Sequence, residues 1–150
     1  MNNIITPYQG WDKVLFTMDY STVRNMLTDS GIKYTIEHWP NKGCMPEVAW
    51  DIIRIENGIS LFFAKDRMFK MYFERGFEGA LNNGICIGMS IDEAKKLDIN
   101  IEYNDDNEEY ISPSGYWLEE SLLSGKIESI TVFIPEVLDD EKFFSYEWCN

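Results

Sequence analysis

Histidine and cysteine, the side chains that act most often as a general base and a thiol nucleophile, are few in this sequence of 150 residues. His38 is the only histidine, and Cys44 is the cysteine whose neighbours best suggest an exposed thiol. A nucleophilic cysteine needs surroundings that stabilise its thiolate, and Lys42 offers one nearby positive charge. A general base needs a nucleophile and an orienting group, which the sequence does not place near His38. We therefore expect His38 to be a partly exposed structural residue and Cys44 not to be catalytic.

The other candidates for chemistry are the 26 carboxylates. The acidic run from Asp105 to Glu109 suggests a calcium loop, but it lacks the central glycine and final glutamate of an EF-hand. One histidine and three scattered cysteines form neither a zinc site nor a disulfide framework. Glycosidases use paired carboxylates, yet this many acids satisfy any separation by chance. The chain has no glycine-rich phosphate loop. The sequence predicts no catalytic residue, metal or cofactor.

Charge is distributed very unevenly along the chain. Residues 1–75 contain nine acidic and nine basic residues, so their formal charges cancel. Residues 76–150 contain seventeen acidic and four basic residues and carry the whole net charge of −13. Such a field repels nucleic acid and anionic membranes and attracts basic surfaces. Neither a membrane span nor a secretory leader is recognisable. We expect a cytoplasmic protein that binds neither nucleic acid nor membranes.

Aromatic residues are interleaved with carboxylates in residues 103–117 and 139–148. A nucleic-acid-binding surface combines aromatic residues with basic residues instead. Carboxylates accelerate encounter with a cationic protein, and aromatic side chains provide buried anchors. The predicted partner-binding residues are Tyr103, Asp105, Asp106, Glu108, Glu109, Tyr110, Asp139, Asp140 and Glu141. Two structural alternatives to partner binding stay open. In the first, Tyr116 and Trp117 are ordinary strand residues, one of which faces the core. In the second, residues 139–148 form an amphipathic tail that docks on the sheet.

The first half of the chain contains the elements with the strongest local signals. Residues 21–30 predict a helix with Ser21 as its N-cap and Gly31 as its stop. Alternation over residues 32–37 predicts a half-buried strand. The Asn57-Gly58 pair separates two apolar runs, residues 48–55 and 59–64, and predicts a β-hairpin with positive φ at both turn residues. A third strand is expected over residues 68–73.

The second half must position the acidic segments. Ser90 and Glu93 have capping-box spacing and predict a short helix to Leu97, preceded by a strand through Ile85 and Ile87. We expect strands at residues 99–103, 116–118 and 127–134, with an acidic loop over residues 104–109. Pro135 predicts a short terminal helix that packs Val137 and Leu138 inward, and helical spacing would place Asp140, Phe144 and Trp148 on a shared face.

Strands follow one another here without regular helical crossovers. This order favours an α+β fold with a mainly antiparallel, curved sheet of about six or seven strands and two or three helices. Neither half is large enough for an independent core, so residues 1–150 are expected to form a single domain.

The sequence predicts a small acidic α+β chain rich in Tyr and Trp. It contains the expected strand–turn–helix stretch GICIGMSIDEAKKL (84–97) and the segments GYWL (115–118) and GKIESI (125–130). In these features the chain resembles the bacterial immunity proteins of contact-dependent growth-inhibition toxin systems. The resemblance implies a protein without catalytic activity that binds one toxin domain, often a nuclease, and occludes it. Because the substrate cleft of a nuclease is positive, an acidic inhibitor competes through the same field.

The function hypothesis is therefore an immunity protein that neutralises a cognate toxin, expected to be a basic nuclease, by stoichiometric binding. Two alternatives remain. One is an acidic adaptor or small-ligand-binding domain. The other is a carboxylate-dependent hydrolase, whose mark would be an inward-facing acid pair with one raised pKa.

Overall fold

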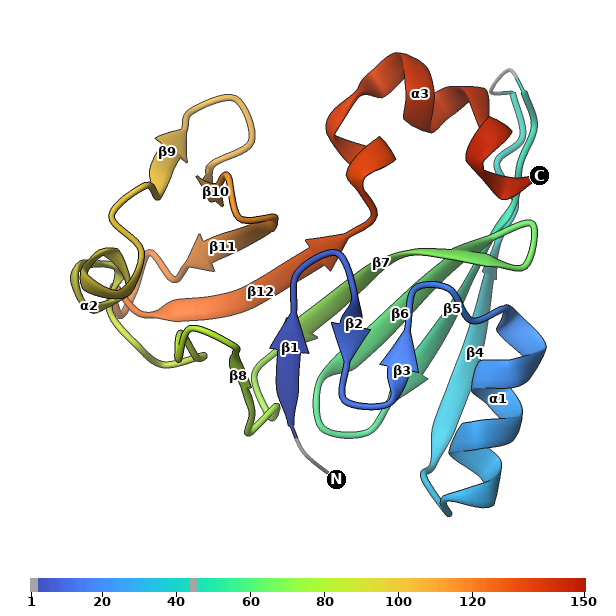
Figure 1. Ribbon diagram of the computed structural model, residues 1–150, viewed down its shortest axis with the longest axis horizontal. Helices are drawn as coiled ribbons and strands as arrows, with labels where there is room; N and C mark the ends of the chain where they lie inside the picture. Colours follow the sequence, from blue (N-terminus) through green and yellow to red (C-terminus); the bar gives the residue numbers. More distant parts are fainter. Residues whose placement is uncertain (1–2, 44–45) are drawn as a thin grey trace.

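The computed structural model describes residues 3–43 and 46–150, and its main feature is a large antiparallel sheet. Its strands are β4 (Tyr34–Trp39), β5 (Trp50–Ile55), β6 (Ile59–Ala64), β7 (Arg67–Glu74), β9 (Glu102–Asn104), β10 (Glu109–Ser112), β11 (Tyr116–Glu120) and β12 (Ile127–Phe133). They lie side by side in the order β4-β5-β6-β7-β12-β11-β10-β9 (Figure 1). The predicted α+β class with a mainly antiparallel sheet is confirmed.

A second, four-stranded sheet was not predicted. It contains β1 (Ile4–Thr6), β2 (Gly10–Trp11), β3 (Val14–Leu15) and β8 (Ala80–Leu81), in the order β3-β2-β1-β8. Strands of two or three residues are too short to show a period-2 pattern. The parallel pairing of β1 with β8 also joins segments that lie far apart in the sequence. The strand count therefore exceeds the predicted six or seven.

The predicted hairpin is confirmed as β5–β6. Asn57 and Gly58 have φ values of 75° and 79°, as the Asn-Gly signal requires. The ladder closes at the pair Ile55–Ile59, so three residues lie outside it. The third predicted strand is β7, which pairs with β6 and carries a bulge opposite Phe62 and Phe63.

In the part of the chain that the structure describes, three α-helices complete the fold, and two of their N-caps test the predicted capping residues. Helix α1 spans Tyr20–Asp29, and its N-cap is Asp19, which accepts a hydrogen bond from the Thr22 N–H, so the predicted Ser21 cap is wrong. Helix α2 spans Ile91–Leu97 with the predicted Ser90 cap. Helix α3 spans Asp140–Ser145 and is flanked by the short 3-10 helices η1 (Pro135–Leu138) and η2 (Glu147–Cys149).

Two other expectations about the second half are wrong. Residues 84–87 form no strand, because the Asn83 side chain and a turn at Gly84 organise this segment locally. The strand expected at residues 99–103 begins only at Glu102, and Ile99 is 84% exposed. Its position directly after α2 keeps Ile99 outside the ladder, so the apolar residue was a misleading strand signal.

The core is built around β6, whose six residues are all buried. Leu61 and Phe63 belong to one apolar cluster with α1 and the small sheet. Phe62 and Ala64 belong to another that includes Phe143 of α3. Because successive strand residues point to opposite faces, β6 is covered on both sides.

The C-terminal segment docks on the sheet, as expected if residues 139–148 form an amphipathic tail. Phe143 packs on Phe69 with ring centroids 5.2 Å apart, and the Trp50 indole N–H donates to the Tyr146 hydroxyl at 3.0 Å. Helix α3 ends at Ser145, so helical spacing does not extend to Trp148. The Trp148 ring stacks on Phe143, with ring centroids 5.6 Å apart, and the prediction that Trp148 shares a helix face with Phe144 is wrong.

Of the two residues expected to pack inward from the terminal helix, Val137 contacts this second cluster. Leu138 remains 55% exposed, because the segment is a 3-10 helix with tighter turns than an α-helix.

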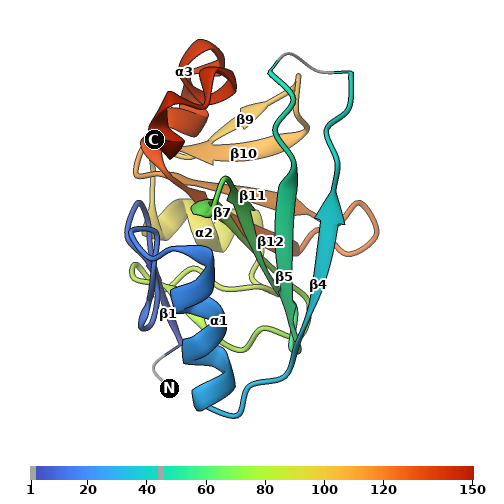
Figure 2. The ribbon, with the colours of Figure 1, turned by 90° about the vertical axis from the view of Figure 1, so that its right-hand side faces the viewer.

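Both views place α3 and the β9–β10 turn at the upper end of the molecule (Figures 1 and 2). The end of α1 and the β5–β6 turn lie at the lower end. Within the described residues, none of the helices is long and apolar enough to cross a membrane.

Replacing Gly115 by Ala should lower the free energy of unfolding by about 2 kcal/mol or more. Gly115 has a φ of 104°, and an added Cβ would lie 2.5 Å from Cε2 of Tyr8, whose ring packs edge-on against Phe133. Gly125→Ala is the matched control, since Gly125 also has positive φ but no atom within 4 Å of a new Cβ. Urea unfolding measures both, and equal losses would contradict a role for the Tyr8 contact.

Candidate functional site

The β9–β10 hairpin carries most of the predicted partner-binding residues on an ordered turn. The Asn104 side-chain oxygen accepts hydrogen bonds from the backbone N–H groups of Asp106 at 2.9 Å and Asn107 at 3.3 Å. Glu108 then takes a left-handed φ of 54°, and the ladder resumes at the Asn104–Glu109 pair. Asp105, Asp106 and Glu108 are exposed. The sequence therefore forms a rigid turn that presents three carboxylates to solvent.

Two predicted aromatic residues pair across this hairpin. Tyr103 and Tyr110 lie opposite each other in the ladder, with ring centroids 4.9 Å apart. Tyr103 is 50% exposed, whereas Tyr110 is half-buried beneath the Lys95 ammonium, which lies 5.5 Å from its ring centroid. Desolvation raises the pKa of Tyr110. The exposed Tyr103 ring is thus supported by a fixed neighbour and is available for contact.

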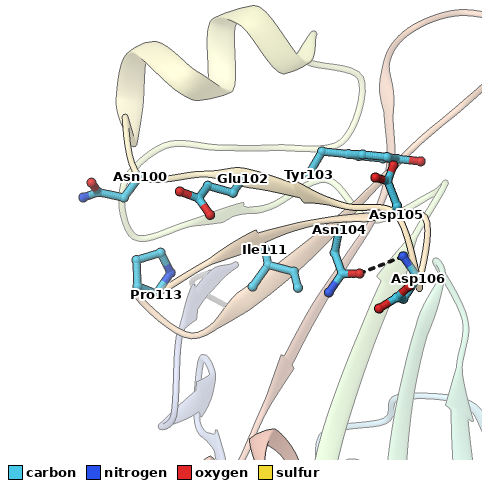
Figure 3. Close-up of a pocket in the computed structure, with 8 residues that line it drawn as sticks. All are labelled: Asn100, Glu102, Tyr103, Asn104, Asp105, Asp106, Ile111 and Pro113. Atoms are coloured by element: carbon cyan, nitrogen blue, oxygen red, sulfur yellow. Dashed lines mark hydrogen bonds between the residues drawn. The ribbon is translucent and has the colours of Figure 1, made fainter.

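A shallow groove of about 660 Å³ runs along the hairpin (Figure 3). Its lining residues are Asn100, Glu102, Tyr103, Asn104, Asp105, Asp106, Ile111 and Pro113. The close-up shows Ile111 of β10 and Pro113 just beyond that strand, with Glu102 and Asn104 of β9 beside them. An apolar strip next to carboxylates suits a cationic or amphipathic chain.

The hairpin is anchored to the fold through Asp98, which follows α2. Its carboxylate accepts hydrogen bonds from the hydroxyls of Ser112 at 2.6 Å and Tyr116 at 2.5 Å. Burial alone would raise the pKa of Asp98, but these hydrogen bonds outweigh it and lower that pKa. Burial, aided by the bond to Asp98, raises the pKa of Tyr116 to about 12. The sequence offered no signal for this network, because its members come from three elements.

Glu109 is separated from the other acidic residues of the hairpin. The register that pairs Tyr110 with Leu118 places Glu109 next to Glu119 of β11. Glu109 is half-buried, and desolvation followed by the Glu119 charge raises its pKa. Lys70 of β7 faces the same two carboxylates, but burial lowers its pKa. Cross-strand register assembles this cluster, so spacing along the chain could not reveal it.

Glu119 and Lys70 have further contacts on this sheet face. The Ser129 hydroxyl donates to the Glu119 carboxylate at 2.6 Å. The Lys70 ammonium lies 4.2 Å from the centroid of the Phe62 ring. Unlike the exposed turn, the cluster therefore consists of partly desolvated charges held by neighbouring strands.

The second acidic segment has a structural role as well as an exposed surface. The Asp139 carboxylate caps α3 by accepting from the N–H groups of Glu141 at 3.0 Å and Lys142 at 3.2 Å. Asp140 and Glu141 are exposed in the first turn, where the helix dipole favours negative charge. This segment lies at the same end of the molecule as the hairpin but on a separate element (Figure 1).

Tyr116 and Trp117 are ordinary residues of strand β11, as one of the alternatives in the sequence analysis stated. Tyr116 is 1% exposed and faces the core. Trp117 packs on the other face of the sheet, with its ring 4.4 Å from that of Phe133.

His38 has an orienting group that the sequence did not reveal. The β4–β5 register places Asp51 opposite His38, and their side chains are joined by a 2.8 Å hydrogen bond. Within residues 3–43 and 46–150, no nucleophile is hydrogen-bonded to His38 and no cluster of three or more potential metal ligands is present. Cys44 lies outside the described residues, and burial raises the pKa of the Cys149 thiol to about 11.

Comparisons with protein-family models, curated proteins and solved structures found no match for this chain.

Replacing Asp98 by Asn should lower the free energy of unfolding by about 1–3 kcal/mol, because two buried hydroxyls lose a charged acceptor. Asp105→Asn, at an exposed position on the same hairpin, is the control and should change stability by less than about 0.5 kcal/mol. Urea unfolding measures both. A similar stability for the two variants would contradict the anchoring role.

The difference between wild type and Asp98→Asn should also depend on pH. Since folding lowers the pKa of Asp98, its stabilisation is complete above the unfolded value of about 3.9 and is lost as pH falls through the lower folded value. Unfolding at about pH 7 and about pH 3 should give a large and a reduced difference, respectively. A difference that stays constant would exclude the ionised Asp98 as the acceptor.

Proposed function

We propose that this protein is an immunity protein that binds a cognate toxin domain, a basic nuclease, and neutralises it by stoichiometric occlusion. The observation that carries the proposal is the ordered acidic hairpin with an exposed tyrosine and an adjoining groove. The resemblance expected from residues 84–97, 115–118 and 125–130 to immunity proteins of contact-dependent growth-inhibition systems motivates the same proposal. The proposed site of action is the cytoplasm.

Electrostatics support a cationic partner for the hairpin end of the sheet. Residues 97–125 contain eight acidic residues and no basic residue. A nuclease attracts phosphate through a positive cleft, and a fixed acidic surface competes for that cleft. The carboxylates of the turn would accelerate encounter, and Tyr103 would provide an anchor once water is excluded.

Preorganisation favours tight binding by this hairpin. Asn104 orders the turn, and Asp98 ties β10 and β11 to α2. A loop that is already ordered loses less conformational entropy on binding. The hairpin can therefore retain more of its contact energy as affinity.

Co-expression tests the broad function. The gene adjacent to the one encoding this chain is expressed in a bacterial host, alone and together with the chain, and growth is followed. The proposal predicts that the neighbour alone stops growth and that this chain restores it. A harmless neighbour, or toxicity that this chain does not relieve, would contradict the proposal and leave the acidic adaptor or small-ligand-binding alternative.

Neutralising the turn as Asp105→Asn/Asp106→Asn/Glu108→Gln should slow association with the toxin about tenfold at low ionic strength and weaken its salt dependence. Stopped-flow rates at about 0.01 M and 0.1 M salt suit this test, because the Debye length falls from about 30 to about 10 Å. Adding Glu109→Gln tests the half-buried position separately.

The matched control is Asp29→Asn/Glu56→Gln/Glu78→Gln, which changes net charge equally at exposed positions away from the hairpin. Glu56 and Glu78 both line a cleft at the lower end of the molecule. Equal slowing by the two triple variants would show that net charge acts, and not the hairpin.

One observation favours the hydrolase alternative. Glu109 and Glu119 are adjacent carboxylates, and the pKa of Glu109 is raised by desolvation and by Glu119. Neither lines the groove of Figure 3, and Glu119 already accepts from Ser129. Turnover of ester, phosphodiester or glycoside substrates by the purified chain, abolished by Glu109→Gln, would support hydrolysis and overturn a function based on binding alone.

A further inference from the structure

The two edge strands of the large sheet differ in how they are protected. Edge strand β9 has three residues, including the exposed Glu102, and borders the acidic turn. A short, charged edge resists pairing with another chain. The opposite edge, β4, has six residues and pairs with β5 without a bulge. Such a regular edge exposes a row of backbone donors and acceptors.

The side chains of β4 add little protection. Ile36 and Trp39 are 40% and 45% exposed. Glu37 could repel a second strand, but Arg54 binds its carboxylate through two hydrogen bonds of 2.7 and 3.0 Å. Tyr34–Trp39 contains no Lys or Pro, two common means of blocking an edge. This edge is therefore competent for pairing.

We propose that β4 pairs antiparallel with β4 of a second copy of this chain, so that the two large sheets form one continuous sheet. A twofold axis at Ile36 places this side chain opposite its own copy and Thr35 opposite Glu37. A register shifted by one pair would place Glu37 opposite itself and Ile36 opposite His38, so the apolar Ile36–Ile36 pair would be lost. The pairing buries Ile36 and satisfies the exposed backbone groups.

The absence of net charge near β4 favours a second copy of this chain as the partner at this edge. Residues 1–75, which include β4 to β7, have no net charge. Two copies joined at β4 bring neutral regions together and keep their acidic hairpins at the two far ends of the joined sheet. Pairing through β9 would instead bring the acidic turns together. The dimer leaves both hairpins accessible and does not depend on the proposed toxin-binding function.

Sedimentation equilibrium from about 1 to about 100 μM tests the proposal. The expected result is a rise from the monomer mass of 17.6 kDa to twice that mass. Ile36→Lys should weaken the dimer at least about tenfold, because it places two ammonium groups opposite each other. Leu15→Lys is the matched control: Leu15 is also 40% exposed, on an edge strand of the small sheet, and the dimer should persist.

Cross-linking tests the register. In a background with Cys44, Cys86 and Cys149 replaced by Ser, Ile36→Cys should form an intermolecular disulfide on mild oxidation, whereas Leu15→Cys should not. Residues opposite each other across an antiparallel pair have Cα atoms about 4.5–5.5 Å apart, within disulfide reach. A monomer at every concentration would overturn the proposal. So would a dimer that tolerates Ile36→Lys but is lost in Tyr103→Lys on the other edge.

Discussion

Burial of both faces of β6 is the constraint on which the other elements depend. Apart from Ser60, its residues are apolar, and all six are buried. A strand of this kind needs a separate cover on each face. Helix α1 and the small sheet supply one cover, and the aromatic C-terminal segment supplies the other. Strand β6 lies two positions from the β4 edge and five from the β9 edge, so its covers lie nearer the β4 edge.

This asymmetry explains where charge is tolerated. Most carboxylates at the β9 end are solvated or hydrogen-bonded, whereas the half-buried Glu109 faces Lys70. Near the covers, charged groups are held by specific contacts, as Glu37 is by Arg54. The first half of the chain must supply the covered strands and has balanced charge, whereas the second half supplies the β9 end. The charge map of the sequence thus corresponds to a gradient along the sheet.

Local signals predicted the elements that local interactions determine. The β5–β6 turn was predictable because Asn57 and Gly58 adopt positive φ at little cost. The start of α2 was predictable because the Ser90 hydroxyl accepts a hydrogen bond from the backbone N–H of Glu93, three residues later in the chain. The exposed acids of the β9–β10 turn were predictable from composition. The short strands β1, β2, β3 and β8 were not, since long-range pairing rather than propensity stabilises them.

The parts of the candidate site that sequence could not reveal are those assembled by register. Glu109 meets Glu119 and Lys70 only because β10, β11, β12 and β7 are neighbours in the sheet. Asp98 reaches Ser112 and Tyr116 only because α2 ends beside β10 and β11. A charge count cannot distinguish these partly desolvated groups from the solvated acids of the turn, although their chemistry differs.

That difference assigns separate physical roles to the two kinds of carboxylate. Exposed groups on the ordered turn act over distance and affect mainly the rate of encounter. Glu109 lies in a partly desolvated site where desolvation and the Glu119 charge raise its pKa, although Lys70 already faces both carboxylates. The solvated carboxylates of the turn and the half-buried pair are thus physically distinct parts of one end of the sheet.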